Sequence, residues 1–333
     1  MANVVYGDIS PRTAAFAQKK LLDRAIPYLV FERFGQSFAL PEHSSRTMIF
    51  RRYLALNPTP KVLVEGVTPN GQPMGKQDIV CAIEQLGDVI NLTDVILDSH
   101  EDPILDVSID QIAEQAAQMI EMMRYGVLRA GTNVVMANGL LRSAVNTPFS
   151  LTLQRRATKA LKRQNARPIT KVIKSTAAYG TEPVARSYIG FCHPDMENDI
   201  RNAVGADGKS VFVPVEKYGS ITPFENEIGK IEDVRYLTST LITPFADAGG
   251  AKGLMTSTSG VNADVYPIII VAQDAYGIVA LKGKFSIVPI VVNPKPTDSD
   301  PLGQRGHVGW KANQGTVILN DAWMVRLEVA ATA

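Results

Sequence analysis

The sequence contains only two cysteines and four histidines among its 333 residues. Cys81 and Cys192 lie far apart in the chain, and neither has a partner at the spacing of a metal-ligand pair. This pattern gives no support for a disulfide framework or a zinc cluster. Both thiols are expected to be buried and reduced, and no cofactor is predicted.

Long apolar runs are also absent. No run reaches the roughly 18 uncharged apolar residues that a membrane span requires, so no membrane association is predicted. The first residues, MANVVYGDISPR, lack the basic and then apolar profile of a signal peptide, which makes the cytosol the expected compartment. A hydrophobic content of 45% is sufficient for a sizeable core.

The common catalytic motifs are missing. No GxSxG, HExxH, GxGxxG or CxxC sequence occurs. Gly75-Lys76 resembles the end of a phosphate-binding loop, but Asn70 replaces the first glycine and Gln77 replaces the hydroxyl residue of that motif. Cys192 and His193 are adjacent on an expected strand and therefore point to opposite faces. A cytosolic Cys/His hydrolase is kept only as a minor alternative, and the chain is not expected to be an enzyme.

One short cluster has the composition of a cation site. The segment 98–102 offers three carboxylates and the imidazole of His100, and hard cations prefer oxygen ligands. A polar turn before a helix explains the same residues. We predict no metal site here.

Charge of one sign is missing from two consecutive segments. Residues 78–123 contain no Lys or Arg but eleven acids: Asp78, Glu84, Asp88, Asp94, Asp98, Glu101, Asp102, Asp106, Asp110, Glu114 and Glu121. Residues 122–181 contain no acid but eleven bases: Arg124, Arg129, Arg142, Arg155, Arg156, Lys159, Lys162, Arg163, Arg167, Lys171 and Lys174. Three interpretations remain open. The blocks form complementary surfaces between copies, they face each other within one molecule, or the basic block lies against nucleic acid.

A hairpin is predicted after a proline-interrupted start. Ser10-Pro11 is typical of a helix N-terminus, which predicts a short helix to about residue 25, and residues 27–60 are expected to be irregular. Apolar and polar residues at 62–65 and 78–86 then predict two strands, joined by turn residues at 68–71. Because an isolated hairpin is marginal in water, these strands need a surface to pack on. That surface belongs either to the same domain or to another chain.

Two helices are predicted in the charged segments. After Asp106, apolar residues recur every three or four positions to Val127, with Ser108 as a capping residue and Gly131 as the stop. This helix would be a spine about 33 Å long. A second helix is expected from Ser150. Its apolar line is Leu153, Ala157 and Leu161, and its remaining surface is a basic face for DNA or an acidic neighbour: Arg155, Arg156, Lys159, Lys162 and Arg163.

From residue 169 onward the pattern favours strands. Runs at 188–191, 211–213 and 266–271 are rich in strand formers, and 316–329 reads as a strand pair or a long bent strand. In the last stretch, Trp323, Val325, Leu327 and Val329 alternate with Met324, Arg326 and Glu328.

Several short runs, in order along the chain, resemble one protein family. They are FRRY at 50–53, EGVTP at 65–69, AGTNVV at 130–135, VEKYG at 215–219, QDAYG at 273–277, DPLGQRG at 300–306, VGWK at 308–311 and ILNDAW at 318–323. Together they resemble the major capsid protein of tailed bacteriophages, from about residue 45 to the end.

The resemblance implies an α+β fold, the Hong Kong 97-type major capsid fold, with five parts. These are an N-terminal arm (1–45), an extended loop (46–90), a peripheral domain with the spine helix (91–168), an axial domain (169–300) and C-terminal strands that return to the peripheral domain (301–333). The loop tip would contact a neighbouring subunit through Gly66, Thr68, Pro69, Asn70, Gly71 and Lys76.

The resemblance also implies a structural role. Copies would form hexamers and pentamers that close into an icosahedral phage head around double-stranded DNA, contacted without sequence specificity. The particle would be a virion assembled in the host bacterial cytoplasm, with scaffolding, portal or decoration proteins as further partners. The chain is expected to be too short ahead of its arm for a cleaved scaffolding segment, and no lysine–asparagine crosslink is predicted. An encapsulin-like bacterial compartment, which shares the fold, is the alternative.

Overall fold

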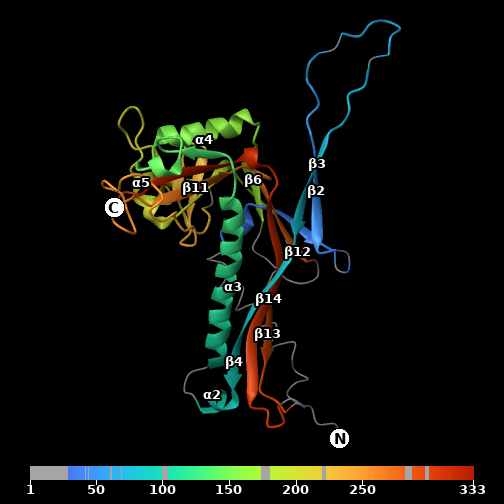
Figure 1. Ribbon diagram of the computed structural model, residues 1–333, viewed down its shortest axis with the longest axis vertical. Coiled ribbons are helices and arrows are strands. Elements are labelled where there is room, and N and C mark those ends of the chain that lie inside the picture. The colour runs from blue at the N-terminus through green and yellow to red at the C-terminus, as the bar shows by residue number, and fades with distance from the viewer. Residues whose placement is uncertain are drawn as a thin grey trace.

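The computed structural model describes residues 29–41, 43, 45–60, 62–68, 70–99, 104–173, 181–219, 223–281, 287–296 and 300–333. The molecule is elongated: a long helix runs beside a narrow sheet, a compact unit lies at one end, and a hairpin extends away from the body (Figure 1). The helix predicted to end near residue 25 lies outside the described residues.

The narrow sheet has five strands and is built around one long strand. β14 pairs with β4 along ten positions, from Arg305–Thr93 to Gln314–Glu84, and with β12 and β13 as well. The order is β1-β12-β14-β13, and β4 pairs with β14 off this path. The strands are β1 (Gln36–Leu40), β4 (Glu84–Thr93), β12 (Tyr276–Leu281), β13 (Val288–Val292) and β14 (Arg305–Ile318).

The predicted spine is α3 (Ile104–Arg129), and its apolar stripe packs on β14. Ile112, Ala116 and Ile120 are buried in one cluster with Trp310. The helix ends as predicted, where the N–H of Gly131 donates to the Leu128 carbonyl at 3.2 Å. The predicted start is wrong: α3 begins four residues before Ser108, which is buried inside the helix. The short helix α2 (Asp94–Ser99) precedes α3.

The compact unit contains a mixed eight-stranded sheet. Its order is β5-β15-β11-β7-β10-β9-β8, with β6 paired to β7. The strands are β5 (Val134–Met136), β6 (Ile169–Ile173), β7 (Thr181–Cys192), β8 (Phe212–Pro214), β9 (Glu227–Ile231), β10 (Val234–Thr238), β11 (Val265–Val271) and β15 (Met324–Ala330). The helices of this unit are α4 (Leu151–Arg163) and α5 (Glu197–Arg201). The predicted strands at 188–191, 211–213 and 266–271 correspond to β7, β8 and β11.

The last strand differs from its predicted pattern. All seven residues of β15 are buried, including Arg326 and Glu328, which alternate with its apolar residues. β15 lies inside the sheet, between β5 and β11. Glu328 is neutralised there by Arg142 at 2.7 Å and by Arg326 at 3.0 Å. Alternation fails because salt bridges to distant segments allow charged side chains to be buried.

The two sheets divide the chain differently from the predicted boundaries. α4, expected with the spine, packs in one core with β11 and β15 of the eight-stranded sheet. β12 and β13, expected with the axial strands, belong to the five-stranded sheet. Of the C-terminal strands, β14 joins the spine and β15 joins the eight-stranded sheet.

Buried charges hold residues 30–32 against the spine. The N–H groups of Val30 and Phe31 donate to Glu121 Oε1 at 2.8 and 2.7 Å. Arg124, which is fully buried, contacts Glu32 at 3.1 Å and Gln314 at 2.7 Å. Through these two side chains, α3 holds both residues 30–32 and β14 in place. Burial raises the pKa of Glu121 to about 7, while Arg124 and the two N–H groups oppose this shift.

This raised pKa predicts a pH-dependent stability. The folded chain binds a proton at Glu121 more tightly than the unfolded chain, so this stabilisation is complete below about pH 4.5 and is lost as pH rises through 7. Glu121→Gln retains an acceptor oxygen and removes the titration. Urea unfolding of unassembled subunits should show the stability of the wild type relative to Glu121→Gln falling by up to about 3 kcal/mol between these pH values. Glu225→Gln, at an exposed ion pair with Arg33, is the control. If the free energies of unfolding of the wild type and Glu121→Gln changed with pH in parallel, the raised pKa of Glu121 would be contradicted.

Candidate intersubunit surface

The hairpin that extends from the body is formed by β2 (Thr47–Tyr53) and β3 (Lys76–Ala82). The strands are antiparallel, from Thr47–Ala82 to Tyr53–Lys76. The predicted second strand is confirmed in β3 and β4. The predicted first strand, at 62–65, is wrong, because those residues lie in the loop and the strand forms at 47–53, within the segment expected to be irregular. The sequence TMIFRRY there is rich in β-branched and aromatic residues, which favour a strand.

The root of the hairpin is fixed to the body. Met48 and Phe50 of β2 pack on a buried cluster that includes Leu40, Cys81 and Val279. The ring of Phe50 meets Phe38 of β1 edge to face, with 4.7 Å between centroids. The root is thus a continuation of the five-stranded sheet's core, which sets the direction of the hairpin.

Beyond Tyr53 the hairpin opens into a long loop, residues 54–75, whose described residues are all exposed. Leu54 N–H donates to the Gly75 carbonyl at 2.9 Å, and Asn57 N–H donates to the Gln72 side chain at 3.1 Å. A turn forms at Gly66, whose positive φ of 77° suits glycine. The tight turn among the described residues is therefore at 64–67, whereas the turn predicted at 68–71 includes a residue outside the described ones. Thr68, Asn70 and Gly71 are exposed in the loop, Lys76 begins β3, and Pro69 lies outside the described residues.

The hairpin is strongly apolar although it lies in solvent. Among the described residues, it carries ten of the exposed large hydrophobic side chains: Ile49, Tyr53, Leu54, Leu56, Val62, Leu63, Val64, Val67, Met74 and Val80. Val62 is 93% exposed and Leu63 is 70% exposed. Contiguous apolar surface of this kind marks a site of association.

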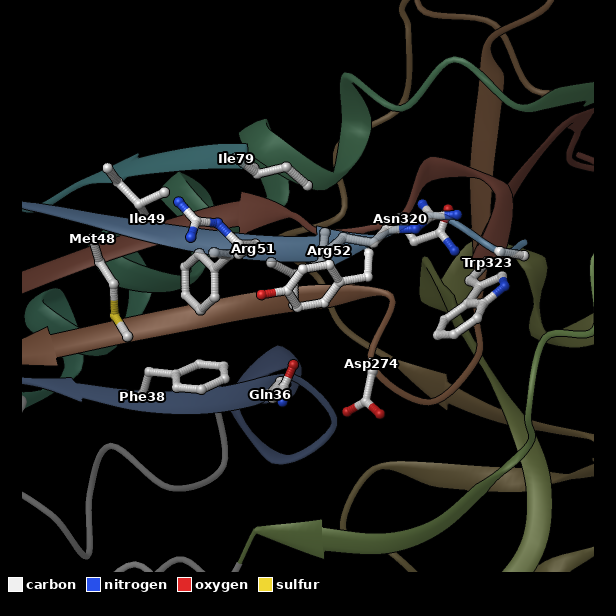
Figure 2. Close-up of a pocket in the computed structure, with 14 residues that line it drawn as sticks. Gln36, Phe38, Met48, Ile49, Arg51, Arg52, Ile79, Asp274, Asn320 and Trp323 are labelled. Carbon is white, nitrogen blue, oxygen red and sulfur yellow. The ribbon is translucent and has the colours of Figure 1, made fainter. Parts of the chain in front are cut away.

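A groove of about 590 Å³ lies beneath the hairpin root. Figure 2 shows it between β2 and β1, with Phe38 rising from β1 and with Asp274 and Trp323 at one end. Apolar and aromatic side chains form most of its lining, while Arg51 and Arg52 lie on the β2 side. Burial raises the pKa of Asp274, and the nearby Arg167 opposes this effect. The lining of the groove therefore combines apolar surface with the charged side chains of Arg51, Arg52 and Asp274.

The five residues of the predicted basic face are separated into two groups. Arg155 pairs with Glu232 and Lys162 pairs with Asp233, each at 2.5 Å. Glu232 and Asp233 are in the turn between β9 and β10. The other three residues, Arg156, Lys159 and Arg163, are exposed and form no salt bridge with any described residue.

The acidic and basic blocks have few contacts with each other in the described part of the chain. Arg124 and Glu121 are the exception, at 3.6 Å. Arg142, Arg155 and Lys162 instead pair with acids beyond residue 226. These salt bridges do not support the interpretation that the blocks neutralise each other within one molecule.

The hydrolase alternative fails on the environment of Cys192. Its thiol is fully buried, donates to the Leu237 carbonyl at 3.5 Å, and has its pKa raised by burial. His193 Nδ1 accepts the N–H of Asp195. Both cysteines are buried and free, as predicted.

Replacement of Cys192 by Ser should therefore affect only packing. We expect a stability loss of about 1–2 kcal/mol, because a hydroxyl is less well suited to an apolar site than a thiol. Iodoacetamide should not label Cys192 in the folded wild type at neutral pH, whereas unfolding in urea should expose it. Rapid labelling of the folded protein would return the hydrolase to consideration.

Two further predictions concern metals and membranes. The side chains of the 98–102 cluster lie outside the described residues. Across the rest of the described chain, no group of three His, Cys, Asp or Glu side chains is arranged to hold a metal ion. None of the described helices combines the length and apolar character needed to cross a membrane.

Comparison with known proteins gives matches only at the level of structure. No family model matches the chain, and no curated protein sequence matches it. The capsid of Ralstonia phage GP4 is similar with a TM-score of 0.66 and 12% identity, over 91% of each chain. The cyanophage Pam1 capsid is similar with a TM-score of 0.59 and 13% identity, over 93% of this chain and 92% of that one. The head structure of Helicobacter pylori bacteriophage KHP40 is similar with a TM-score of 0.60 and 11% identity, over 90% of this chain and 88% of that one. These similarities show that the predicted α+β, Hong Kong 97-type fold is correct.

Proposed function

We propose that this chain is a major capsid protein, the subunit of an icosahedral phage head that encloses double-stranded DNA. The observation that carries the proposal is the apolar hairpin, whose large hydrophobic side chains are left exposed by the described part of the chain and which belongs to a fold shared with phage capsids. Copies associate into hexamers and pentamers, and these close into a shell.

In this proposal each part of the chain has a role in assembly. Residues 1–45 are an N-terminal arm, and the β2–β3 hairpin is the extended loop. The peripheral domain is α3 with the five-stranded sheet, and the axial domain is the eight-stranded sheet with α4 and α5. This division follows the two sheets and replaces the boundary expected at residue 168.

The energy of assembly comes mainly from the hairpin. Burying one Val or Leu side chain contributes at most about 1.5–3 kcal/mol, and the loop segment Val62–Val67 offers four such side chains. Association costs several kcal/mol in lost translational and rotational freedom, so several side chains must be buried together to offset it. A fixed root and an apolar tip allow one copy to reach the next without the subunit refolding.

The proposal includes the partners and location that accompany a phage head. The subunit is part of the virion, assembles in the host bacterial cytoplasm, and contacts packaged DNA without sequence specificity. Scaffolding, portal and decoration proteins are further partners. The role is structural, which agrees with the buried, unreactive position of Cys192.

The mass of the purified protein tests this function. Light scattering on chain expressed in bacteria should give megadalton particles, or rings of five and six that convert to particles, and negative-stain images should show closed shells. A chain that stays monomeric or dimeric, at high concentration and with a crowding polymer present, would contradict the proposal.

A further inference from the structure

The exposed edge of α4 carries three cations that the subunit does not neutralise. Arg156, Lys159 and Arg163 have the spacing i, i+3 and i+7, which places them in one row along the helix. The opposite side of α4 is buried through Leu153, Ala157 and Leu161. The three cations, here called the α4 ridge, therefore point directly away from the core.

The in-chain salt bridges define the limits of the ridge. Glu232 and Asp233 bind Arg155 and Lys162 on one flank of the helix. This flank fixes α4 on the β9–β10 turn. The structure thus separates cations that hold the helix from cations that remain available to a partner.

The position of the ridge indicates the kind of partner. Figure 1 views the molecule down its shortest axis, and α4 lies along the outline of the compact unit, at its upper edge. In a shell made of flat subunits, the broad faces meet the interior and the exterior, while the edges meet neighbouring subunits. We therefore expect α4, which lies along this outline, to be next to another copy.

The overall charge favours the same partner. The chain has a formal net charge of +1, so its acids nearly balance its bases. The electrostatic affinity for DNA grows with the number of phosphates that a protein neutralises, and three side chains neutralise few of them. Copies of a nearly neutral subunit with separated charges can instead neutralise one another, and such contacts set the register of association.

We propose that the α4 ridge docks on an acidic surface of a second copy of this chain and sets the register between adjacent subunits. The inference rests on the proposed shell function. It decides between the two partners, DNA and an acidic neighbour, that the sequence left open for this helix.

Charge reversal tests the ridge in shells made without phage DNA. Arg156→Glu, Lys159→Glu and Arg163→Glu together should lower shell yield at least tenfold, with the circular dichroism and melting temperature of the subunit nearly unchanged. The same three residues changed to Gln, which preserves helix propensity, should give a severalfold loss. Reversal of Lys209, Lys217 and Lys252 changes the net charge equally and should leave the yield within twofold.

Chemical crosslinking provides a second readout. A carbodiimide joins a lysine amine to a carboxylate that touches it, so shells assembled from a mixture of isotopically labelled and unlabelled subunits should contain Lys159–Asp or Lys159–Glu links between two different copies.

The outcomes separate this inference from the function on which it rests. Wild-type chain that forms no shells refutes the function. Wild-type shells together with normal assembly of the reversed variant, or with no link between copies at Lys159, refute the ridge contact alone. Normal shells of the reversed variant that bind less added duplex DNA after disassembly than wild-type subunits do would assign the ridge to nucleic acid and overturn the proposal.

Discussion

Removal of the hairpin tip should leave a folded subunit that no longer assembles. Ala55 and Met74 continue the register in which Tyr53 pairs with Lys76, so replacement of residues 56–73 by Asn-Gly closes the strands with a two-residue turn. No residue between 41 and 80 contributes a buried hydrophobic side chain to the described core. The melting temperature of the subunit should therefore change by no more than about 2 °C, since surface changes are nearly neutral. Shells should be absent from sucrose gradients and from negative-stain images.

Two full-length variants make this test specific. Val62→Ser, Leu63→Ser and Val64→Ser together keep the loop length and remove its apolar surface, and should lower shell yield at least tenfold. Asn57→Ala removes only the side-chain oxygen that accepts the Thr59 N–H at 3.1 Å and the Thr59 hydroxyl at 2.7 Å, both within the loop, and should assemble normally. Normal shells from the shortened hairpin would show that the tip is not an intersubunit contact.

Arg124→Met should give the largest loss of stability of any single substitution considered. Arg124 is the only described cation within 4 Å of the buried Glu121, and it also binds Glu32 and Gln314. Methionine fills similar space but leaves the buried carboxylate uncompensated, which typically costs about 3–5 kcal/mol. Urea unfolding should be measured in the shortened-hairpin background, because assembly itself raises apparent stability.

A second substitution identifies the cause of that loss. Glu121→Gln added to Arg124→Met removes the unpaired charge and should recover at least half of the lost stability. Arg156→Met, on the exposed side of α4, is the matched control and should change stability by less than about 0.5 kcal/mol. An Arg124→Met variant as stable as that control would contradict the role assigned to the buried cluster.

The elements that the sequence predicted are those with a local signal. The spine was predictable because its apolar residues recur with helical spacing over 26 residues, and its end because Gly131 follows. α4 was predictable from Ser150, whose side chain accepts the Leu153 N–H as an N-cap does. Of the eight-stranded sheet, β7, β8 and β11 were predictable from runs of strand-forming residues, most clearly in Val265–Val271.

The features that the sequence missed depend on residues far apart in the chain. Glu328 is buried because Arg142, 186 positions earlier, reaches it. The first hairpin strand was assigned to the apolar run at 62–65, whereas the strand forms at Thr47–Tyr53, where Met48 and Phe50 have a core to pack on. No local pattern separates Arg155 and Lys162 from the α4 ridge, because their partners are 77 and 71 residues away.

The most direct test of the shell account is cryo-electron microscopy of assembled particles, at a resolution that traces side chains. We expect a closed icosahedral shell in which residues 54–75 of each copy lie on a neighbouring copy, with Val62, Leu63 and Val64 buried at the contact. Particles in which this loop folds back on its own subunit, or extends into solvent without touching another copy, would contradict it.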